Sequence, residues 1–585
     1  MFLDDNFRIL LIDMSARKIS IDKTYSRKLY MGGVGLASKL LEDHMYPQKE
    51  PIDPDQPIVF AIGPLSTIYP VITKVVSMFI SPLTGELGES YAGGRFALSM
   101  FSAGFDAIVI KGGASKPCYI SISDNEVLFR DARPMWGSEK DNIGRIIRFE
   151  ERHGGTRSIV RIGEGGENKV SFAAVTVDRY RHFGRMGLGA LFGAKNLKAI
   201  NIAGSYKRDI SSLPKYFKVY RKIYDICANS DTMKKYHDIG TPVNVLPLNA
   251  ANALPTKNLQ QSSFEHADKI SGEVFSEHRQ VRKLACAGCP VGCIHIGQFR
   301  RAFNETGYEY ETINVGYDYE LIFALGSFLG LSNPEHILEL IEEVEIAGLD
   351  SMSTGVALGW ATEVLNDPNT EVTEEHTIEK LEFGKYEAYL KAVHHISKRK
   401  NDFYTALGMG VKAASEKYGG TSYAMHIAGN EMPGYHTGYG SLVGVAVGAR
   451  HSHLDNGGYS IDQGMKPLDV DEIVDALLKE EIERCMLNSL VICLFARKVY
   501  DRDTILEAFD AIGMPLTNED LDAVAKRTFA TKLRIKQKLG FKLPEIKFPK
   551  RFFKTVSMNG LLDEDTAMNI LLRYDEKING MEGFE

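Results

Sequence analysis

The spacing of apolar and polar residues changes about one third of the way along the chain. Up to about residue 208, short apolar runs alternate with clusters of Gly, Pro and Asp. Such punctuation is typical of strands joined by turns, so this part is predicted to be β-rich. The clearest strands are expected at 8–13, 58–62, 107–111, 119–123 and 199–203, with short helices at 35–44 and 139–152.

Beyond about residue 211 the apolar residues recur at helical spacing. Asn333 and Pro334 precede a periodic apolar stretch that stops at Gly348. A capping Asn, a Pro in the first turn and a Gly stop together predict a helix between them. Further helices are expected at 471–497, 503–513 and 518–540. The predicted fold class is α+β, with a β-rich domain (1–208) followed by two mainly helical domains (209–414 and 415–585).

Composition and charge exclude several classes of protein. The 585 residues carry 69 Lys and Arg against 76 Asp and Glu, a net charge of −7. A slightly negative net charge gives no indication of a basic surface, so nucleic acid is not an expected partner. The sequence also shows no obvious basic patch at which an acidic protein would dock. The longest apolar stretch, 489–496, is far shorter than the roughly 20 residues of a membrane span. Asp4 and Asp5 stand where a signal peptide carries positive charge, so we expect a soluble cytoplasmic protein.

Three cysteines cluster in eight residues, at Cys286, Cys289 and Cys293. Thiolates at this spacing select zinc or an iron–sulfur cluster, and either group needs a fourth ligand. The candidates for that ligand are His295 and a distant cysteine, of which Cys493 is the best placed. A buried core cysteine is the other interpretation of Cys493. The spacing alone leaves zinc and iron–sulfur both open.

Five sequence blocks, in the same order along the chain, resemble the tungsten-dependent aldehyde:ferredoxin oxidoreductases. The resemblance covers essentially the whole chain and is more specific than any single motif. It implies that the β-rich first domain forms a base for pterin cofactors and that the helical domains close over a metal. The blocks are 63–112, 166–200, the CAGCPVGC loop, 347–355 and 492–495.

The resemblance also implies a set of cofactors. Members of the family hold one tungsten, sometimes molybdenum, between the dithiolenes of two pterins, with one [4Fe–4S] cluster nearby and Mg²⁺ bridging the pterin phosphates. The family's cluster ligands correspond to Cys286, Cys289, Cys293 and Cys493. This correspondence favours iron–sulfur over zinc.

Pterin binding in the family uses two segments of the form DxxGL(D/C). In the first segment of this chain Glu345 replaces the leading Asp, so a carboxylate remains. In the second, Asn488 replaces the Asp and Val491 replaces the Gly, which removes a charge and restricts the backbone. The pterin-contacting positions implied by the match are Glu345, Gly348, Leu349, Asp350, Asn488 and Ile492.

The phosphate ends of the pterins are expected against the first domain. The family Asn near the Mg²⁺ is Tyr91 here, where a backbone carbonyl would serve a hard cation as well. Lys74 aligns with a family Arg that bridges cluster and pterin, and it keeps the charge without the bidentate fork. The other matching positions are Ala92, Gly93, Gly94, Arg181, His182, Gly184 and Arg185.

Aldehyde oxidation adds the oxygen of water and removes two electrons and two protons, so a carboxylate and a His are expected near the metal. The family Glu has two candidates in similar GYxYE blocks; the register favours Glu320, and Glu311 is the runner-up. The family His corresponds to His453, with His451 as its neighbour. Asp455 takes the place of a family Lys on the substrate side of the pocket. Tyr435 and His436 are further candidates for the pocket wall.

The expected function is therefore oxidation of a small aldehyde, with electrons passing to ferredoxin or to a polyferredoxin-like subunit. Two alternatives stay open: a reductase of the same family acting on aromatic acyl-thioesters or carboxylates, and an iron–sulfur electron-transfer protein without tungsten. A homodimer and a complex with an electron-transfer subunit are both compatible with the sequence.

Overall fold

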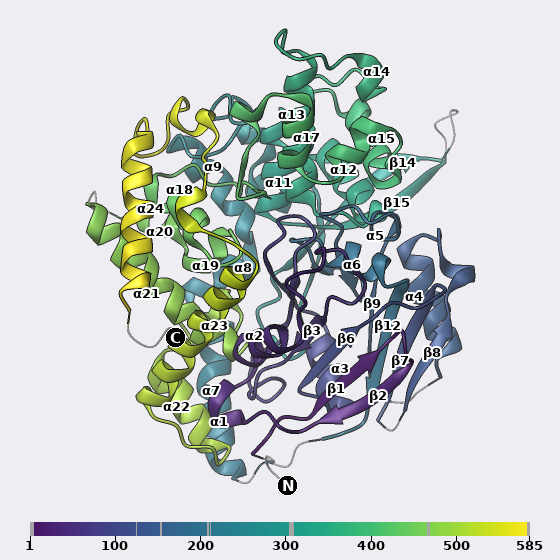
Figure 1. Cartoon of the computed structure of the whole chain (residues 1–585), viewed down its shortest axis with the longest axis vertical. Coiled ribbons are helices and arrows are strands. Elements are labelled where there is room, and N and C mark those ends of the chain that lie inside the picture. Colours follow the sequence, from purple (N-terminus) through teal and green to yellow (C-terminus); the bar gives the residue numbers. More distant parts are fainter. Residues whose placement is uncertain are drawn as a thin grey trace.

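A computed structural model describes residues 5–124, 126–152, 155–207, 210, 212–303, 309–464 and 469–581. The predicted boundary near 209 and the start of the first GYxYE block lie outside these residues. Two sheets occupy the N-terminal part and helices form most of the remainder (Figure 1). This arrangement confirms the predicted α+β class.

The first sheet has six strands in the order β2–β1–β6–β3–β4–β5, with β1 and β6 parallel and the other neighbours antiparallel. On β3, Ile58 and Phe60 face one apolar core while Val59 and Ala61 face another. A strand buried on both faces reads as a continuous apolar run, which is why the sequence revealed it. The strands are β1 (Ile9–Asp13), β2 (Lys18–Asp22), β3 (Ile58–Ala61), β4 (Val75–Ile80), β5 (Leu87–Ala92) and β6 (Ala107–Lys111).

The second sheet also has six strands, in the order β11–β10–β9–β12–β7–β8. Phe60 of the first sheet contacts Phe96 of α3 and Phe183 of β11, with ring centroids 5.4 Å apart in both pairs. One apolar core therefore joins the two sheets. The strands are β7 (Cys118–Ile122), β8 (Val127–Asp131), β9 (Thr156–Arg161), β10 (Val175–Val177), β11 (Arg181–Phe183) and β12 (Leu197–Gly204). The helices of this part are α1 (Arg27–Tyr30), α2 (Gly33–His44), α3 (Phe96–Ser102), α4 (Lys140–Glu150), α5 (Glu164–Glu167) and α6 (Leu188–Ala194).

The middle of the chain contains a sheet that the helical periodicity did not predict. Strands β13 (Gln280–Leu284), β14 (Ile294–Ala302) and β15 (Tyr310–Tyr317) form an antiparallel sheet. Its strands carry polar residues and are half exposed, so they lack the apolar runs that marked the N-terminal strands. The loop from β13 to β14 is the cysteine loop.

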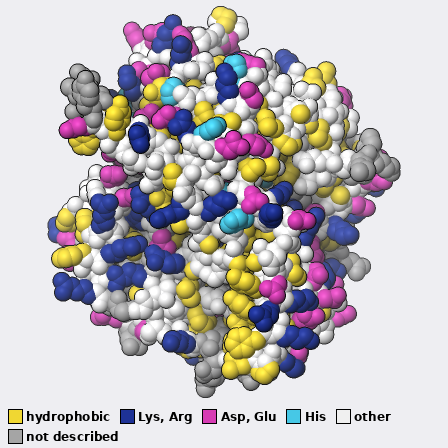
Figure 2. Space-filling view, turned by 180° about the vertical axis from the view of Figure 1, so that it is seen from behind, with side chains coloured by type: hydrophobic (Ala, Val, Ile, Leu, Met, Phe, Trp, Pro, Cys, Tyr) yellow, Lys and Arg dark blue, Asp and Glu magenta, His cyan; other side chains and the backbone are white. Residues whose placement is uncertain are grey.

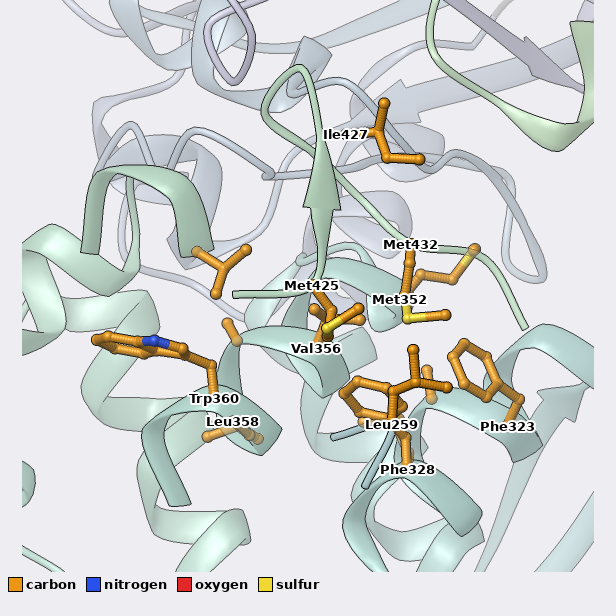
Figure 3. Close-up of a cluster of buried hydrophobic side chains, with 14 of the residues drawn as sticks. Leu259, Phe323, Phe328, Met352, Val356, Leu358, Trp360, Met425, Ile427 and Met432 are labelled. Atoms are coloured by element: carbon orange, nitrogen blue, oxygen red, sulfur yellow. The ribbon is translucent and has the colours of Figure 1, made fainter. Parts of the chain in front are cut away.

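Many of the remaining helices share one large core, whereas Leu213–Asn229 and Arg502–Ala511 pack into the core of the first sheet. Figure 3 shows part of the large core, where Phe323, Phe328 and Leu259 pack beside Met352 and Val356. No helix among the described residues is long and apolar enough to cross a membrane. The helices are α7 (Leu213–Asn229), α8 (Asp231–Asp238), α9 (Val245–Ala250), α10 (Gly272–His278), α11 (Tyr319–Leu325), α12 (Pro334–Ala347), α13 (Ser351–Leu365), α14 (Glu374–Thr377), α15 (Tyr386–Lys398), α16 (Asp402–Leu407), α17 (Val411–Tyr418), α18 (Tyr439–Val447), α19 (His453–Asn456), α20 (Gly458–Asp462), α21 (Val470–Ser489), α22 (Arg502–Ala511), α23 (Asn518–Lys538) and α24 (Glu564–Asn579).

The boundary expected at 414/415 falls inside α17. Val411 and Ala414 of this helix belong to the same core as Leu442 of α18 and Leu477 of α21. Apolar packing therefore runs continuously across the position at which the sequence suggested a division.

Helix ends show where the periodicity was reliable. Asn333 caps α12, with its Oδ1 accepting a hydrogen bond from Glu335 N (2.9 Å), and Gly348 ends the helix at φ +71°. By contrast, the helix predicted over 471–497 stops at Ser489. Val491 turns at φ +52° and ends it, because a left-handed residue cannot continue a right-handed helix.

Candidate active site

A cavity of about 930 Å³ lies where the N-terminal sheets meet the helical region. Its wall includes residues from the first domain, from the β13–β15 sheet and from several helices. The expected site residues that line it are Lys74, Tyr91, Gly93, Arg181, His182, Gly184, Arg185, Cys286, Cys289, Cys293, Glu320, Glu345, Leu349, Asp350, His453 and Cys493.

The first domain holds both cysteine segments through its backbone. Ala287 N in the cysteine loop donates to Gly94 O (3.0 Å), and Val71 N donates to Gly288 O (3.3 Å). Val71 O in turn accepts a hydrogen bond from Cys493 N (3.3 Å). One residue of the N-terminal domain therefore ties the cysteine loop to a segment more than two hundred residues later in the chain.

The donor set at this place consists of four free thiols. The charges of Cys286, Cys293 and Cys493 all act on Cys289, so the four side chains are neighbours. In the described part of the chain, no three His, Cys, Asp or Glu side chains are grouped as a single metal ion requires. A Cβ on Gly93 would lie 2.5 Å from Cys286 Sγ, so only glycine permits this approach. Four neighbouring thiols are a donor set that zinc and iron–sulfur groups both use.

Electrostatics differ among the four thiols. Burial raises the pKa of Cys289 to about 12 and that of Cys293 to about 11. At Cys286, burial is outweighed by Lys74, Arg181 and the Gly94 N–H, which lower the pKa of the thiol. The protein thus places cationic charge beside the position where thiolates would gather.

Two helices end with the same turn beside the cavity. After α12, Gly348 has φ +71°, and after α21, Val491 has φ +52°. In both turns the following N–H donates to the carbonyl five residues earlier, at 3.1 Å. This is the hydrogen bond of a Schellman turn, in which a left-handed residue normally has to be Gly. The two pterin segments expected from the sequence therefore share one backbone shape, and Val491 adopts it under strain.

Glu345 enters the cavity as a paired carboxylate. It forms an ion pair with Lys140 of α4, and His182 Nε2 lies 3.0 Å from its Oε2. Although burial opposes ionisation, His182 and Lys140 hold the pKa of Glu345 well below its usual range. The first pterin segment therefore keeps a fixed negative charge in place of the family Asp.

Arg185 is held by three acceptors. Its Nη2 donates to Asn430 Oδ1 (2.6 Å) and Glu431 O (2.7 Å), and its Nε donates to Asp350 Oδ2 (3.3 Å). Its Nη1 is buried and has no partner among the described residues. Since Arg185 lines the cavity, this N–H group is available to a bound molecule.

Glu320 and His453 meet at the cavity from two short helices. Glu320 lies in the first turn of α11, capped by Asp318, and His453 begins α19, capped by Ser452. His453 Nε2 is 3.2 Å from Glu320 Oε1, while Glu320 Oε2 accepts a hydrogen bond from Gly434 N (3.1 Å). Glu320 Oε1 and His453 Nδ1 have no hydrogen-bond partner within the described part of the chain.

Burial shifts both groups toward their neutral forms. Burial, reinforced by Asp318 and Asp350, raises the pKa of Glu320 to about 8. Burial, together with the cationic Arg185 and Arg450, lowers the pKa of His453 to about 3. At neutral pH a protonated carboxyl therefore faces an unprotonated imidazole. Such a perturbed pair in a cavity can accept and return a proton.

Comparisons with known proteins identify the family. The N-terminal domain model of aldehyde ferredoxin oxidoreductase matches residues 9–204, and the model of its domains 2 and 3 matches residues 218–577. These two matches span nearly all of the chain. The chain belongs to the aldehyde ferredoxin oxidoreductase family.

Several relatives within the family are similar over most of their length. Tungsten-containing aldehyde ferredoxin oxidoreductases of Pyrococcus furiosus and Thermococcus kodakarensis are both 30% identical over 574 residues, which is 94% of this chain and 91% of each relative. An aliphatic sulfonate oxidoreductase, WOR-like subunit, of Pyrococcus furiosus is 28% identical, covering 84% of this chain and 80% of that protein.

A solved structure is similar in fold. The active-site complex BamBC of benzoyl-coenzyme A reductase, in complex with 1,5-dienoyl-CoA, matches with a TM-score of 0.78 at 18% identity. The match covers 98% of this chain and 94% of that one. The family models and this structural match agree on the fold, and the chain is an oxidoreductase of this family.

Some positions expected from the aldehyde ferredoxin oxidoreductase pattern lie away from the cavity. Glu311 is exposed on β15, 3.8 Å from Arg301. His451 is buried against Glu86, with its Nε2 3.1 Å from the carboxylate. Asp455 does not face the pocket as expected, because Arg450 binds it at 2.6 Å. Ala92, Gly94, Gly348, Asn488 and Ile492 also lie behind the cavity wall.

An aromatic cluster beside His453 completes the pocket of this family member. Tyr435, which the sequence suggested, stacks on Tyr459 with ring centroids 4.3 Å apart, and His453 lies 5.3 Å from the Tyr435 ring. His436 instead turns away, with its Nε2 3.0 Å from Thr555 O. Tyr459 was missed because a single Tyr in a Gly-rich segment carries no local signal of a site.

Proposed function

We propose that this chain oxidises aldehydes to carboxylic acids in the cytoplasm. In the overall reaction an aldehyde and water give the acid, two protons and two electrons. The electrons pass through one [4Fe–4S] cluster to ferredoxin or a ferredoxin-like subunit. The observation that carries the proposal is one cavity lined by both the Glu320–His453 pair and four cysteine thiols. The tungsten-containing relatives at 30% identity support it.

The residues present fit the cofactors that the family implies. Cys286, Cys289, Cys293 and Cys493 would hold the cluster. The residues that follow the two Schellman turns, with Arg181 and Arg185, would hold the pterins, and backbone oxygens near Tyr91 and His182 would face Mg²⁺. The bis-pterin tungsten or molybdenum supplies the capacity to accept an electron pair. The chain supplies position, charge and proton transfer.

Glu320 is assigned the proton transfer. In its ionised form the carboxylate accepts a proton from water or from the hydrated aldehyde. His453 Nε2, 3.2 Å from Glu320 Oε1, is unprotonated at neutral pH and accepts the hydrogen of the resulting carboxyl, which orients that group. The free Nη1 of Arg185 donates to an oxygen of the bound molecule.

Metal analysis of anaerobically purified protein is the first test. One tungsten or molybdenum with the irons of one cluster supports the proposal, and an aldehyde panel with viologen dye as acceptor then measures turnover. Zinc alone overturns it, and iron without tungsten or molybdenum favours an electron carrier. The same assay is repeated with carboxylates, aromatic acyl-thioesters and an aliphatic sulfonate as substrates. The comparison separates aldehyde oxidation from the reactions suggested by other relatives.

A further inference from the structure

The cysteine end of the cavity is lined by residues of α8 and of the short 3-10 helix Leu494–Ala496, and Lys235 of this wall is exposed. Lys235, Tyr236, Phe495 and Arg497 line the cavity together with Cys493. The rings of Tyr236 and Phe495 stack with centroids 4.2 Å apart and planes 8° apart. Because Phe495 is two residues beyond Cys493, this aromatic pair lies beside a thiol expected to hold the cluster.

Four cationic side chains lie on the two segments at this end of the cavity. We call Lys234, Lys235, Arg497 and Lys498 the basic rim. Within the described residues none of the four forms an ion pair, and Lys234, Lys235 and Lys498 are exposed. Helix α8 also carries Asp231 and Asp238, which balance its two lysines, so the excess positive charge comes from Arg497 and Lys498. The rim is therefore locally positive in a chain whose net charge is −7.

An aromatic ridge on α7 adjoins the same region. The ridge consists of Tyr216, Phe217, Tyr220 and Tyr224, whose neighbouring rings lie 5.3 to 6.2 Å apart. Phe217 is 58% exposed and Tyr224 is 43% exposed. Figure 2, which views the molecule from behind, shows apolar side chains gathered at the lower end of that face.

The ridge and the cysteines lie on one side of the molecule. Cys227, on the buried side of α7, lies in the apolar core against which Cys493 packs, and burial together with the charge of Cys493 raises the pKa of the Cys227 thiol. Helix α8 follows α7 after a single residue, Ser230, and contacts both α7 and the 3-10 helix Leu494–Ala496, so the ridge and the basic rim belong to neighbouring elements. Exposed aromatic side chains beside unpaired cations are characteristic of protein interfaces.

We propose that the aromatic ridge and the basic rim form the docking surface for a small acidic electron-carrier protein. This inference rests on the proposed function, because the carrier receives the electrons that aldehyde oxidation releases. Each electron lost at the cysteine-held cluster reduces one oxidised centre of the carrier, so two such centres are reduced per aldehyde. Complementary charge steers the acidic carrier to this face, and the aromatic side chains supply apolar contact area.

The test is direct binding of an acidic two-cluster ferredoxin to the anaerobic holoenzyme, measured by surface plasmon resonance at low and at high salt. In the variant combining Lys234→Glu and Lys498→Glu, the dissociation constant should rise about tenfold at low salt and less at high salt, because salt screens exposed charges. The matched control combines Lys18→Glu and Lys116→Glu. It makes the same change in net charge at exposed positions of the first domain and should bind as the wild type does.

A second variant tests the ridge. Phe217→Ser should weaken binding of the same ferredoxin at both salt concentrations, because it removes apolar contact rather than charge. If the rim variant, the ridge variant and the wild type all bind ferredoxin with the same affinity, the proposed docking surface is wrong. A change in oligomeric state with unchanged ferredoxin affinity also overturns it, because the ridge would then cover a second copy of this chain.

The viologen assay separates this proposal from the proposed function. Variants at Lys234 and Lys498 should oxidise aldehydes with dye at the wild-type rate, since neither residue lines the cavity. If the wild type binds ferredoxin through the rim but oxidises no aldehyde, the docking surface stands and the substrate assignment fails.

Discussion

At the scale of single residues, Glu320 and Glu311 show how tertiary structure separates two similar motifs. Both occur in GYxYE blocks, and the sequence left the second as an alternative. Glu311 lies on an exposed strand, whereas Glu320 begins a helix whose N-terminus points into the cavity. Burial then raises the pKa of Glu320 to about 8, which suits this carboxyl for proton transfer.

Replacing Glu320 by Gln should lower turnover by at least about 100-fold, the size of a typical general-base contribution. The amide keeps the shape of the side chain and cannot accept the proton. Glu311→Gln is the matched control and should leave kcat unchanged. Tungsten and iron content, measured on the same samples, should match the wild type in both variants; near-normal turnover of the Glu320 variant would place proton transfer elsewhere.

The same carboxyl predicts a pH dependence. Glu320 has a pKa raised to about 8, so the ionised form that accepts a proton accumulates as pH rises through that value. We therefore expect kcat/KM for an uncharged aldehyde to increase roughly tenfold per pH unit below 8 and to level off above it. A profile that stays flat between pH 6.5 and 9 would contradict the role of Glu320.

At the scale of elements, turns position the cofactor-facing residues. The sequence analysis placed a long helix over 471–497 because apolar residues recur there at helical spacing. In the structure α21 stops at Ser489, and Val491 adopts a left-handed φ of +52°, a strain of order 1–3 kcal/mol. Val491 corresponds to Gly348 of the first segment, and the strain at Val491 indicates that the turn itself is needed there. Apolar periodicity does not reveal such a turn.

Close backbone packing makes Gly93 a second test at this scale. A Cβ at this position would lie 2.5 Å from Cys286 Sγ, so Gly93→Ala should displace one cysteine of the set. We expect the purified variant to retain markedly less iron per chain than the wild type. Gly580→Ala is the control, because its Cβ would meet no atom closer than 3.4 Å. Full iron content in the Gly93 variant would argue against the cluster position.

At the scale of the whole molecule, buried ion pairs connect the first domain to the C-terminal helices. Lys532 of α23 pairs with Glu89 of β5 at 2.7 Å, and Lys536 pairs with Glu86 at 2.9 Å. Both lysines are about 2% exposed. This network, rather than a catalytic role, explains the burial of His451, whose Nε2 lies 2.9 Å from Lys536 Nζ.

Removing one partner of such a pair leaves an uncompensated buried charge. Lys532→Met should therefore lower the free energy of unfolding by about 3–5 kcal/mol, measured by denaturant titration of the apoprotein. Lys538→Met is the control on the same helix. Lys538 is 48% exposed in its pair with Glu42, so its loss should cost less than about 1 kcal/mol. Equal stability of the two variants would contradict the importance of the buried network.

The sequence by itself determined the family, the α+β class and the elements with the clearest apolar patterns, among them β1, β3, β6, β12, α12 and α22. These depend on local periodicity and on ordered motifs, which survive divergence because each is confined to a short segment. It also named the four cysteines and the Glu and His that line one cavity. It did not reveal the β13–β15 sheet, the end of α21 or Tyr459.

Tertiary structure decided the rest, because these features depend on contacts between distant segments. Val71 joins two cysteine segments, Arg450 draws Asp455 away from the pocket, and burial shifts the pKa of Glu320. The net charge of the whole chain likewise gave no sign of the basic rim beside Cys493. Distances between side chains far apart in sequence fix charge, access and proton affinity, and only the folded chain sets those distances.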